Sequence, residues 1–274
     1  MPSMPEITPR RDLHVFYVLD TSGSMEGAPI QILNTTMQET IRAMEKVAKS
    51  NGDAQLKISV LEFASTARWM QKEGPEKVED FTWIDLSAGG LTQMGAAIKE
   101  LNSKLNRKEF LNSPTGSFLP IIIFMTDGHP TDDYEKELQE MKKNKLFCRA
   151  AKIGFAVGDH ADTEMIAHLT GDSEAVIRTN NLGLFAKLLQ FVSVTSSIVG
   201  SASQVSGGPI STGGSIVTEV LNDMGVSPDE VRPGFSYFDD ETVILDEPEA
   251  NIGGVDLMAK EEPPQVEWDE DDDW

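Results

Sequence analysis

The fold is decided by residues 15–25, which read VFYVLDTSGSM. The first five of these residues are apolar or aromatic without alternation, which is typical of a strand buried on both faces of a parallel sheet. Asp20, Ser22 and Ser24 follow this strand directly, and Gly23 lets the backbone turn between the two serines. Because ligands of open α/β sheets bind beyond the carboxyl ends of the strands, this loop is a candidate ligand site.

The loop offers one carboxylate and two hydroxyl groups, which are hard oxygen ligands that suit Mg²⁺ or Mn²⁺. The same residue types also cap helices, so Asp20, Ser22 and Ser24 alone leave a helix cap open as the alternative. Two further stretches of the chain, described below, bear on this choice.

Strand and helix patterns alternate over most of residues 13–200. Unbroken or nearly unbroken apolar runs predict strands, and apolar residues at steps of three and four predict helices. The predicted strands cover 56–63, 119–125, 150–157 and 175–177 in addition to the first one, and the predicted helices cover 30–49, 94–105, 131–145 and 182–199. Residues 67–70 follow a strand too closely for a crossover, so they predict a short antiparallel edge strand. The expected fold class is α/β, with a doubly wound, mostly parallel central sheet and helices on both faces.

The composition predicts four segments. Residues 1–11 are expected to be a disordered lead, 12–200 the folded domain, 201–220 a Gly/Ser-rich linker, and 221–274 an acidic, mostly disordered tail. The formal net charge is −22, and residues 221–274 alone contain 18 acids and 2 bases. No basic patch in the sequence argues for nucleic acid, and the net repulsion of the nucleic-acid phosphates argues against it as a partner.

Cysteine content and the N-terminal sequence bear on the compartment. The single cysteine, Cys148, excludes an intramolecular disulfide framework. The sequence shows neither a signal-peptide pattern nor 18 consecutive apolar residues, so we expect a cytoplasmic protein without a membrane partner.

Two further loops carry oxygen ligands. Thr92 lies in the Gly-rich stretch GGLTQMG at 89–95, where a helix cap is again the alternative role, and Asp127 follows the apolar strand 119–125 in the sequence TDG at 126–128. Together with DTSGS at 20–24, these motifs resemble the metal-ion-dependent adhesion site of the von Willebrand factor type A domain family. They occur in the family's order and at family-like separations, and the resemblance covers about residues 12–200.

The resemblance implies a set of metal ligands and a way of binding. Ser22, Ser24 and Thr92 would supply hydroxyl ligands, while Asp20 and Asp127 would act directly or through water. An ion held by neutral hydroxyls and only two carboxylates keeps residual positive charge, and in this family it accepts a carboxylate from a partner's Asp or Glu. Thr126 is at least as well explained as a packed residue at the strand end, so it is not assigned to the site.

Hydrolytic chemistry has little support in the sequence. None of the four histidines falls at the spacing of zinc ligands, Ser22 has no Gly-x-Ser-x-Gly elbow, and no phosphate-binding Gly-x-x-x-x-Gly-Lys motif occurs. We therefore expect a binding protein and not an enzyme. The enzymatic alternative is a metal-dependent phosphohydrolase with Asp20 as nucleophile, but such enzymes generally place a second Asp where this chain has Ser22.

Within the family, three stretches are most similar to the TerY-like proteins of bacterial tellurium-resistance operons. They are LDTSGSM at 19–25, GAPI at 27–30 and MTDGHPTD at 125–132. This similarity implies a scaffold or regulator in a stress response such as tellurite resistance or phage defence, acting with a protein kinase and a PP2C-type phosphatase. The alternative within binding is an adaptor of an AAA-type ATPase.

Overall fold

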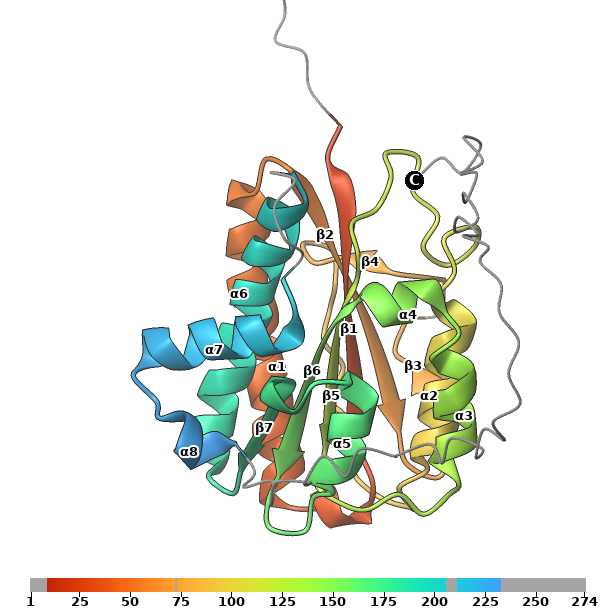
Figure 1. Ribbon diagram of the computed structural model, residues 1–274, viewed down its shortest axis with the longest axis vertical. Coiled ribbons are helices and arrows are strands. Elements are labelled where there is room, and N and C mark those ends of the chain that lie inside the picture. Colours follow the sequence, from red (N-terminus) through yellow and green to blue (C-terminus); the bar gives the residue numbers. More distant parts are fainter. Residues whose placement is uncertain (1–8, 72, 206–210, 233–274) are drawn as a thin grey trace, which may run out of the picture. The chain divides into compact units, whose positions relative to one another are not determined.

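The computed structural model describes residues 9–71, 73–205 and 211–232. Its centre is a seven-stranded sheet with the strand order β3-β2-β1-β5-β6-β7, in which β4 also pairs with β2. The strands are β1 (Arg11–Asp20), β2 (Ala54–Phe63), β3 (Ala67–Trp69), β4 (Glu76–Lys77), β5 (Ile121–Thr126), β6 (Ala151–Val157) and β7 (Val176–Thr179). All pairs are parallel except those of β3 and β4 with β2 (Figure 1). The predicted α/β class, the mostly parallel sheet and the antiparallel edge strand are confirmed, and β4 adds a second, two-residue antiparallel pairing.

The central strand β1 explains why the sheet carries helices on both faces. Every residue from Asp12 to Asp20 is buried, with β2 on one side and β5 on the other. Tyr17 and its alternate neighbours pack into a core shared with α1 (Ala28–Ser50), α6 (Leu182–Val205) and α7 (Gly213–Met224). Phe16 and Val18 point the other way, into a core shared with α2 (Met94–Lys104), α3 (Tyr134–Met141) and α5 (Thr163–Thr170). Helices cover both faces of β1, so residues on both faces of this strand must be apolar, and this explains the unbroken apolar run.

The strand register brings the loops of interest together. Leu19 of β1 lies beside Met125 of β5, and Asp20 lies beside Phe63 of β2. Since the strands are parallel, the chain leaves β1 and β5 at the same edge of the sheet. We call this the carboxyl edge, and the opposite one, where the parallel strands begin, the amino edge.

The helix predicted over 131–145 is wrong in its extent. The structure has α3 over Tyr134–Met141 and a separate short helix α4 over Lys145–Arg149. Asn144 separates them, because its side chain accepts a hydrogen bond of 3.0 Å from the Leu146 backbone N–H and so caps α4. The break turns Phe147 into the core.

The predicted linker and tail also need correction within the described residues. Helix α6 continues to Val205, and α7 and the short helix α8 (Pro228–Val231) follow in the segment predicted to be linker and tail. Apolar residues at helical spacing on α7 are buried in the main core: Ile216, Val217, Val220 and Leu221. The Gly/Ser content indicated flexibility, but burial of this apolar stripe outweighs it. At the other end, β1 begins at Arg11, inside the predicted lead; residues 1–8 and 233–274 lie outside the described residues.

The apolar character of helix α6 is explained largely by its packing in the core. Its segment Leu182–Ala202 has the length and composition of a membrane-crossing helix. However, Phe185, Leu188, Leu189 and Val192 are buried in the core beneath it. Packing on the sheet therefore accounts for much of its apolar character.

Candidate metal centre

Asp20 is the most deeply placed of the predicted site residues. It is the last residue of β1 and has no exposed surface. Its Oδ1 accepts a hydrogen bond of 2.7 Å from the Ser22 backbone N–H, and its Oδ2 accepts one of 2.5 Å from the hydroxyl of Thr126, the last residue of β5. These two bonds hold the carboxylate in one orientation between the two strand ends.

The two serines continue this network toward the loop after β5. The hydroxyl oxygens of Ser22 and Ser24 lie 3.0 Å apart, and the Ser24 hydroxyl donates a hydrogen bond of 2.6 Å to Asp127 Oδ1. Ser22 is buried whereas Ser24 is exposed, so the network runs from the interior to the surface. The structure thus brings together Asp20, Ser22, Ser24 and Asp127 as predicted.

Thr92, in the loop before α2, lies beside the same group of residues. A Cβ added at Gly128 would lie 3.7 Å from both the Ser24 and the Thr92 hydroxyl oxygens, so both hydroxyls border this glycine. The Thr92 hydroxyl forms no hydrogen bond within the described part of the chain, and the Thr92 side chain is not the N-cap of α2. Its alternative role as a cap is therefore not seen, and its oxygen is available to a ligand.

Two loop-to-loop contacts hold Thr92 in this place. The Thr92 carbonyl accepts a hydrogen bond of 2.8 Å from the Thr131 backbone N–H. Asp132 then accepts from the backbone N–H groups of Gly95 and Ala96, at 3.0 and 3.1 Å, and so caps the first turn of α2 from outside the helix. A side chain at Gly95 would meet this carboxylate, since an added Cβ would lie 2.9 Å from Asp132 Oδ2.

The glycines before Thr92 hold its loop against the Asp20 loop. The Gly89 N–H donates to the Thr21 carbonyl at 2.8 Å, and the Gly23 N–H donates to the Gly90 carbonyl at 3.0 Å. Gly90 has φ +90°, and an added Cβ there would lie 2.6 Å from Ser65 Oγ. Only glycine fits this position, because the backbone is left-handed and the space is filled.

The electrostatics of the site favour a bound cation. Burial raises the pKa of Asp20, and the nearby charge of Asp127 adds to that shift, while hydrogen bonds from Thr126 and Ser22 oppose it. Burial likewise raises the pKa of Asp127. No described lysine, arginine or histidine forms an ion pair with either carboxylate. Two partly desolvated carboxylates without a counter-charge are costly unless a cation is bound between them.

The donor set suits a hard divalent ion. Three hydroxyl oxygens and two carboxylates match the oxygen ligands of Mg²⁺ or Mn²⁺. Within residues 9–71, 73–205 and 211–232, no group of three or more His, Cys, Asp or Glu side chains is placed to hold a metal. The Nδ1 atom of His129 lies 3.0 Å from Oδ2 of Asp162, the residue that caps α5. The residues present therefore fit an ion held largely by hydroxyls.

Sequence reasoning missed two residues that shape this centre. Thr126 was not assigned to the site, yet its fully buried hydroxyl binds Asp20. Thr131 and Asp132 are both candidate caps for the helix predicted over 131–145, yet the Asp132 carboxylate caps α2. The Thr-Asp-Gly motif could have indicated Thr126, whereas no local pattern indicates the contact between Asp132 and Gly95.

The fold and the edge loops can now be compared with known proteins. A family model of the von Willebrand factor type A domain matches residues 14–190. Among curated proteins, human inter-alpha-trypsin inhibitor heavy chain H6 is 26% identical over 186 residues, which are 64% of this chain and 14% of that protein.

Solved structures show the same fold at low identity. Proximal thread matrix protein 1 from the mussel byssus, with a zinc-occupied metal-ion-dependent adhesion site, has a TM-score of 0.52 at 16% identity, covering 69% of this chain and 48% of that one. The minor pilin PilB from Streptococcus sanguinis has a TM-score of 0.51 at 14% identity, covering 75% and 65%. The chain spans less than two thirds of the length of each of these proteins.

Proposed function

The chain belongs to the von Willebrand factor type A domain family, and from this premise we propose that it is a metal-dependent protein-interaction module. The ion would be held by Asp20, Ser22, Ser24, Thr92 and Asp127. The observation that carries the proposal is the continuous set of oxygen atoms that joins Asp20 to Asp127 through the two serines, with no described cationic side chain paired to it.

Each residue of this centre has a role that follows from its contacts. Thr126 and the Ser22 N–H fix the Asp20 carboxylate, and Asp132 fixes the helix start that carries Thr92. A hard divalent cation bound there would supply a Lewis-acidic position for a carboxylate oxygen of a partner's Asp or Glu. Three of the five ligands are neutral hydroxyls, so the ion would keep the Lewis acidity that favours a further carboxylate from an acidic partner.

We propose Mg²⁺ or Mn²⁺ as the ion. All five side chains offer oxygen, and neither histidine nor cysteine is among them, which favours a hard ion. Zinc occupies the corresponding motif in the mussel protein, so zinc is the competitor to include in a metal titration.

An enzymatic role is the weaker proposal. Asp20 is the residue that would act as nucleophile in a phosphohydrolase, but its carboxylate is fully buried and both of its oxygens accept hydrogen bonds. A nucleophile needs an oxygen that can reach its substrate. We therefore propose binding without turnover.

For the biological setting we propose a cytoplasmic stress response in bacteria, such as tellurite resistance or phage defence. The support is the similarity of residues 19–25 and 125–132 to TerY-like proteins, which implies a protein kinase and a PP2C-type phosphatase as partners. An adaptor of an AAA-type ATPase is the alternative. Purification of the tagged chain from its own host separates these proposals, because the kinase and phosphatase or the ATPase would co-purify.

The direct test of the centre uses Mn²⁺ and acetate as probes. The full chain is stripped with EDTA and titrated with MnCl₂ by calorimetry, and water-proton relaxation then reports whether acetate displaces water from the bound ion. We expect one Mn²⁺ site in the wild-type chain, a loss of that site in Asp20→Ala, and a fall in relaxivity on adding acetate. Unchanged Mn²⁺ binding in the folded variant would contradict the ligand assignment, and unchanged relaxivity would contradict the open position for a carboxylate.

A further inference from the structure

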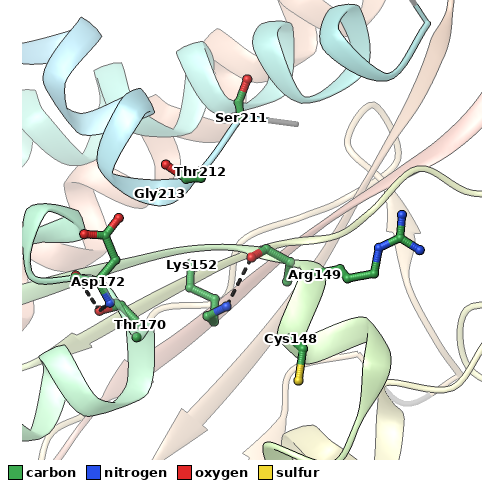
Figure 2. Close-up of a pocket in the computed structure, with 10 residues that line it drawn as sticks. Cys148, Arg149, Lys152, Thr170, Asp172, Ser211, Thr212 and Gly213 are labelled. Carbon is green, nitrogen blue, oxygen red and sulfur yellow. Dashed lines mark hydrogen bonds between the residues drawn. The ribbon is translucent and has the colours of Figure 1, made fainter. Parts of the chain in front are cut away.

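A cavity of about 420 Å³ lies at the amino edge of the sheet, opposite the metal centre. It is bordered by the end of α4, the start of β6, the end of α5 and the start of α7 (Figure 2). Most of the residues that line it are polar or charged: Cys148, Arg149, Lys152, Thr170, Asp172, Ser211 and Thr212. Its volume falls in the range of pockets that take small molecules.

Lys152 is the cation at the centre of this cavity. Its Nζ donates hydrogen bonds to the carbonyl oxygens of Phe147 and Ala150, at 3.1 and 3.3 Å. An ammonium group has three donors, so one N–H forms no hydrogen bond within the described part of the chain, although Nζ also lies 5.0 Å from the centroid of the Phe147 ring. Burial lowers the pKa of Lys152, because it removes part of the hydration of the ammonium group, and the negative charge of Asp172 opposes that shift. A bound anion would replace the favourable interactions with water that the ammonium group has lost.

The acid nearest to Lys152 is already engaged elsewhere. Asp172 Oδ1 accepts from the Glu174 N–H at 2.9 Å, and Asp172 Oδ2 accepts from the Gly214 N–H at 3.2 Å. Figure 2 shows its carboxylate turned toward the start of α7, away from Lys152. The salt bridges of the described residues do not include one between Asp172 and Lys152. Asp172 is therefore near enough to raise the pKa of Lys152 but forms no ion pair with it, so the ammonium group can still contact a ligand.

The start of α7 forms the opposite wall of the cavity. Gly213 packs directly on the backbone of β6, since an added Cβ would lie 1.8 Å from the Lys152 carbonyl oxygen. Ser211 and Thr212 precede it and line this wall. The Thr212 hydroxyl oxygen accepts a hydrogen bond of 3.2 Å from the Ser215 backbone N–H and so caps α7, and the Ser211 hydroxyl points away from Lys152 in Figure 2. Helix α7 has 12 residues, and the partial positive charge of its N-terminal end is met by the Asp172 carboxylate, which accepts from the Gly214 N–H.

One more cationic side chain lines the cavity, and two others lie near that side chain. Arg149 lines the cavity, and its guanidinium group extends away from Lys152 (Figure 2). Arg149 also lies close enough to Arg107 for its charge to lower the pKa of that residue, after burial and together with Arg11. Arg11 and Arg107 both donate to the Ser117 carbonyl, at 3.0 and 3.3 Å, and no described carboxylate pairs with either of them. In a chain of net charge −22, such a concentration of cations attracts anions locally.

From this arrangement we infer that the amino-edge cavity is a second ligand site, which binds the phosphate group of a small phosphorylated molecule. The Lys152 ammonium group contacts the phosphate, the remainder of the cavity takes the rest of the molecule, and the arginines raise the local concentration of the anion. This site is separate from the metal centre and does not depend on the function proposed for that centre.

The test uses inorganic phosphate and phenyl phosphate on the full chain in EDTA, so that phosphate bound to a metal does not contribute. Titrations at constant ionic strength, followed by amide chemical shifts, should move the signals of Lys152, Gly171 and Gly213 and leave those of Ser22 and Ser24 in place. Phenyl phosphate should bind at least about tenfold tighter than phosphate, because the cavity also buries the ring. Chloride serves as the salt control, since it screens charge at equal ionic strength.

Lys152→Met removes the ammonium group and keeps the apolar stem, and Lys145→Met on α4 is the matched control outside the cavity. We expect about tenfold weaker phosphate binding in Lys152→Met and wild-type binding in Lys145→Met. Arg149→Gln leaves the hydrogen bonds of Lys152 to Phe147 and Ala150 intact and should weaken binding severalfold. This second variant keeps the test valid if Lys152→Met fails to fold. Equal affinities in all four proteins, shifts spread over the surface, or the same shifts on adding chloride would overturn the inference.

Discussion

The hydroxyl of Thr126 donates a hydrogen bond of 2.5 Å to Asp20 Oδ2, which joins the last residues of β5 and β1 across 106 positions in the sequence. Both residues have no exposed surface. The bond therefore fixes a buried carboxylate that would otherwise lack one of its two partners. It also means that the metal centre is supported by a residue that need not touch the ion.

Thr126→Val tests this support, because valine keeps the shape and removes the donor. We expect the free energy of unfolding to fall by about 1–3 kcal/mol, since a buried carboxylate oxygen loses its partner. Mn²⁺ affinity should fall as well, because Asp20 is no longer held in place. Urea unfolding and calorimetry measure the two effects. Thr195→Val on α6 is the control, because the Thr195 hydroxyl forms no hydrogen bond with the part of the chain that the structure describes. Wild-type values for both quantities in Thr126→Val would contradict the role given to Thr126.

Removal of the metal should lower stability by an amount set by the ion's concentration. An ion that binds only the folded chain stabilises it by about 2.7 kcal/mol at 100 times its dissociation constant. We expect the Tm of the wild-type chain to rise with MnCl₂ and to return to its starting value with EDTA. Ser24→Ala should reduce the rise, because it removes a ligand and the bond to Asp127. A rise of the same size in that variant would show that the ion binds elsewhere.

Asp132→Ala should act on the metal centre from a distance. The variant loses the cap of α2, which costs about 0.5–2 kcal/mol of stability, and it frees the helix start that carries Thr92. Mn²⁺ affinity should therefore fall although Asp132 is not one of the assigned ligands. Asp133→Ala is the matched control, because Asp133 stands at the N-cap of α3 without a side-chain capping bond. Equal effects of the two substitutions would contradict this explanation.

His14 should make the protein less stable in mild acid. Burial is the main cause that lowers the pKa of His14 to about 4 from its ordinary 6.5, with Asp12 opposing the shift and Lys57 and Arg107 adding to it. Neither ring nitrogen has a hydrogen-bond partner within the described residues. Between pH 6.5 and 4 the unfolded chain binds the proton and the folded chain does not, so stability falls as the pH falls through this window, by up to about 3 kcal/mol.

His14→Phe removes this contribution and keeps an aromatic ring beside Phe16, which His14 stacks on at a centroid distance of 6.4 Å. Urea unfolding at pH 7.5 and pH 4.5 measures the effect. The difference between the two pH values should be smaller in the variant by about 2–3 kcal/mol. If the two proteins lose the same stability, the destabilisation in acid has another source.

Gly213→Ala tests whether α7 is part of the folded domain. The added methyl group would collide with the Lys152 carbonyl, and such overpacking costs about 1–3 kcal/mol. Limited proteolysis should then cut the segment between α6 and α7 faster than in the wild-type chain. Gly183→Ala on α6 is the control, because its added Cβ would have only an ordinary contact of 3.4 Å with Asn181. Unchanged stability and cutting in Gly213→Ala would argue against tight packing of α7.

Some features of the protein followed from local patterns alone. The apolar run of β1 predicted a strand buried on both faces, because no surface residue interrupts it. The alternation of strands and helices predicted a mostly parallel sheet, and parallel strands place the loops after β1 and β5 at one edge. Asp20, Ser22, Ser24 and Asp127 were predicted to meet for this reason, and the hydrogen bonds between them bring these four together.

Other features depend on contacts between distant segments and had no local signal. The sequence could not show that Asp132 caps α2 and not α3, because Asp132 lies just before α3 in the sequence and 37 positions from Gly95, so only the folded chain brings the two together. Glycine and serine around 201–215 indicated a linker, yet the apolar stripe of α7 packs on the sheet and is buried there. Local sequence determines which segments form strands and helices, because backbone sterics and apolar periodicity act over a few residues. Which of these segments support the metal centre was decided only by the tertiary structure, since packing and hydrogen bonds join residues as much as 106 positions apart.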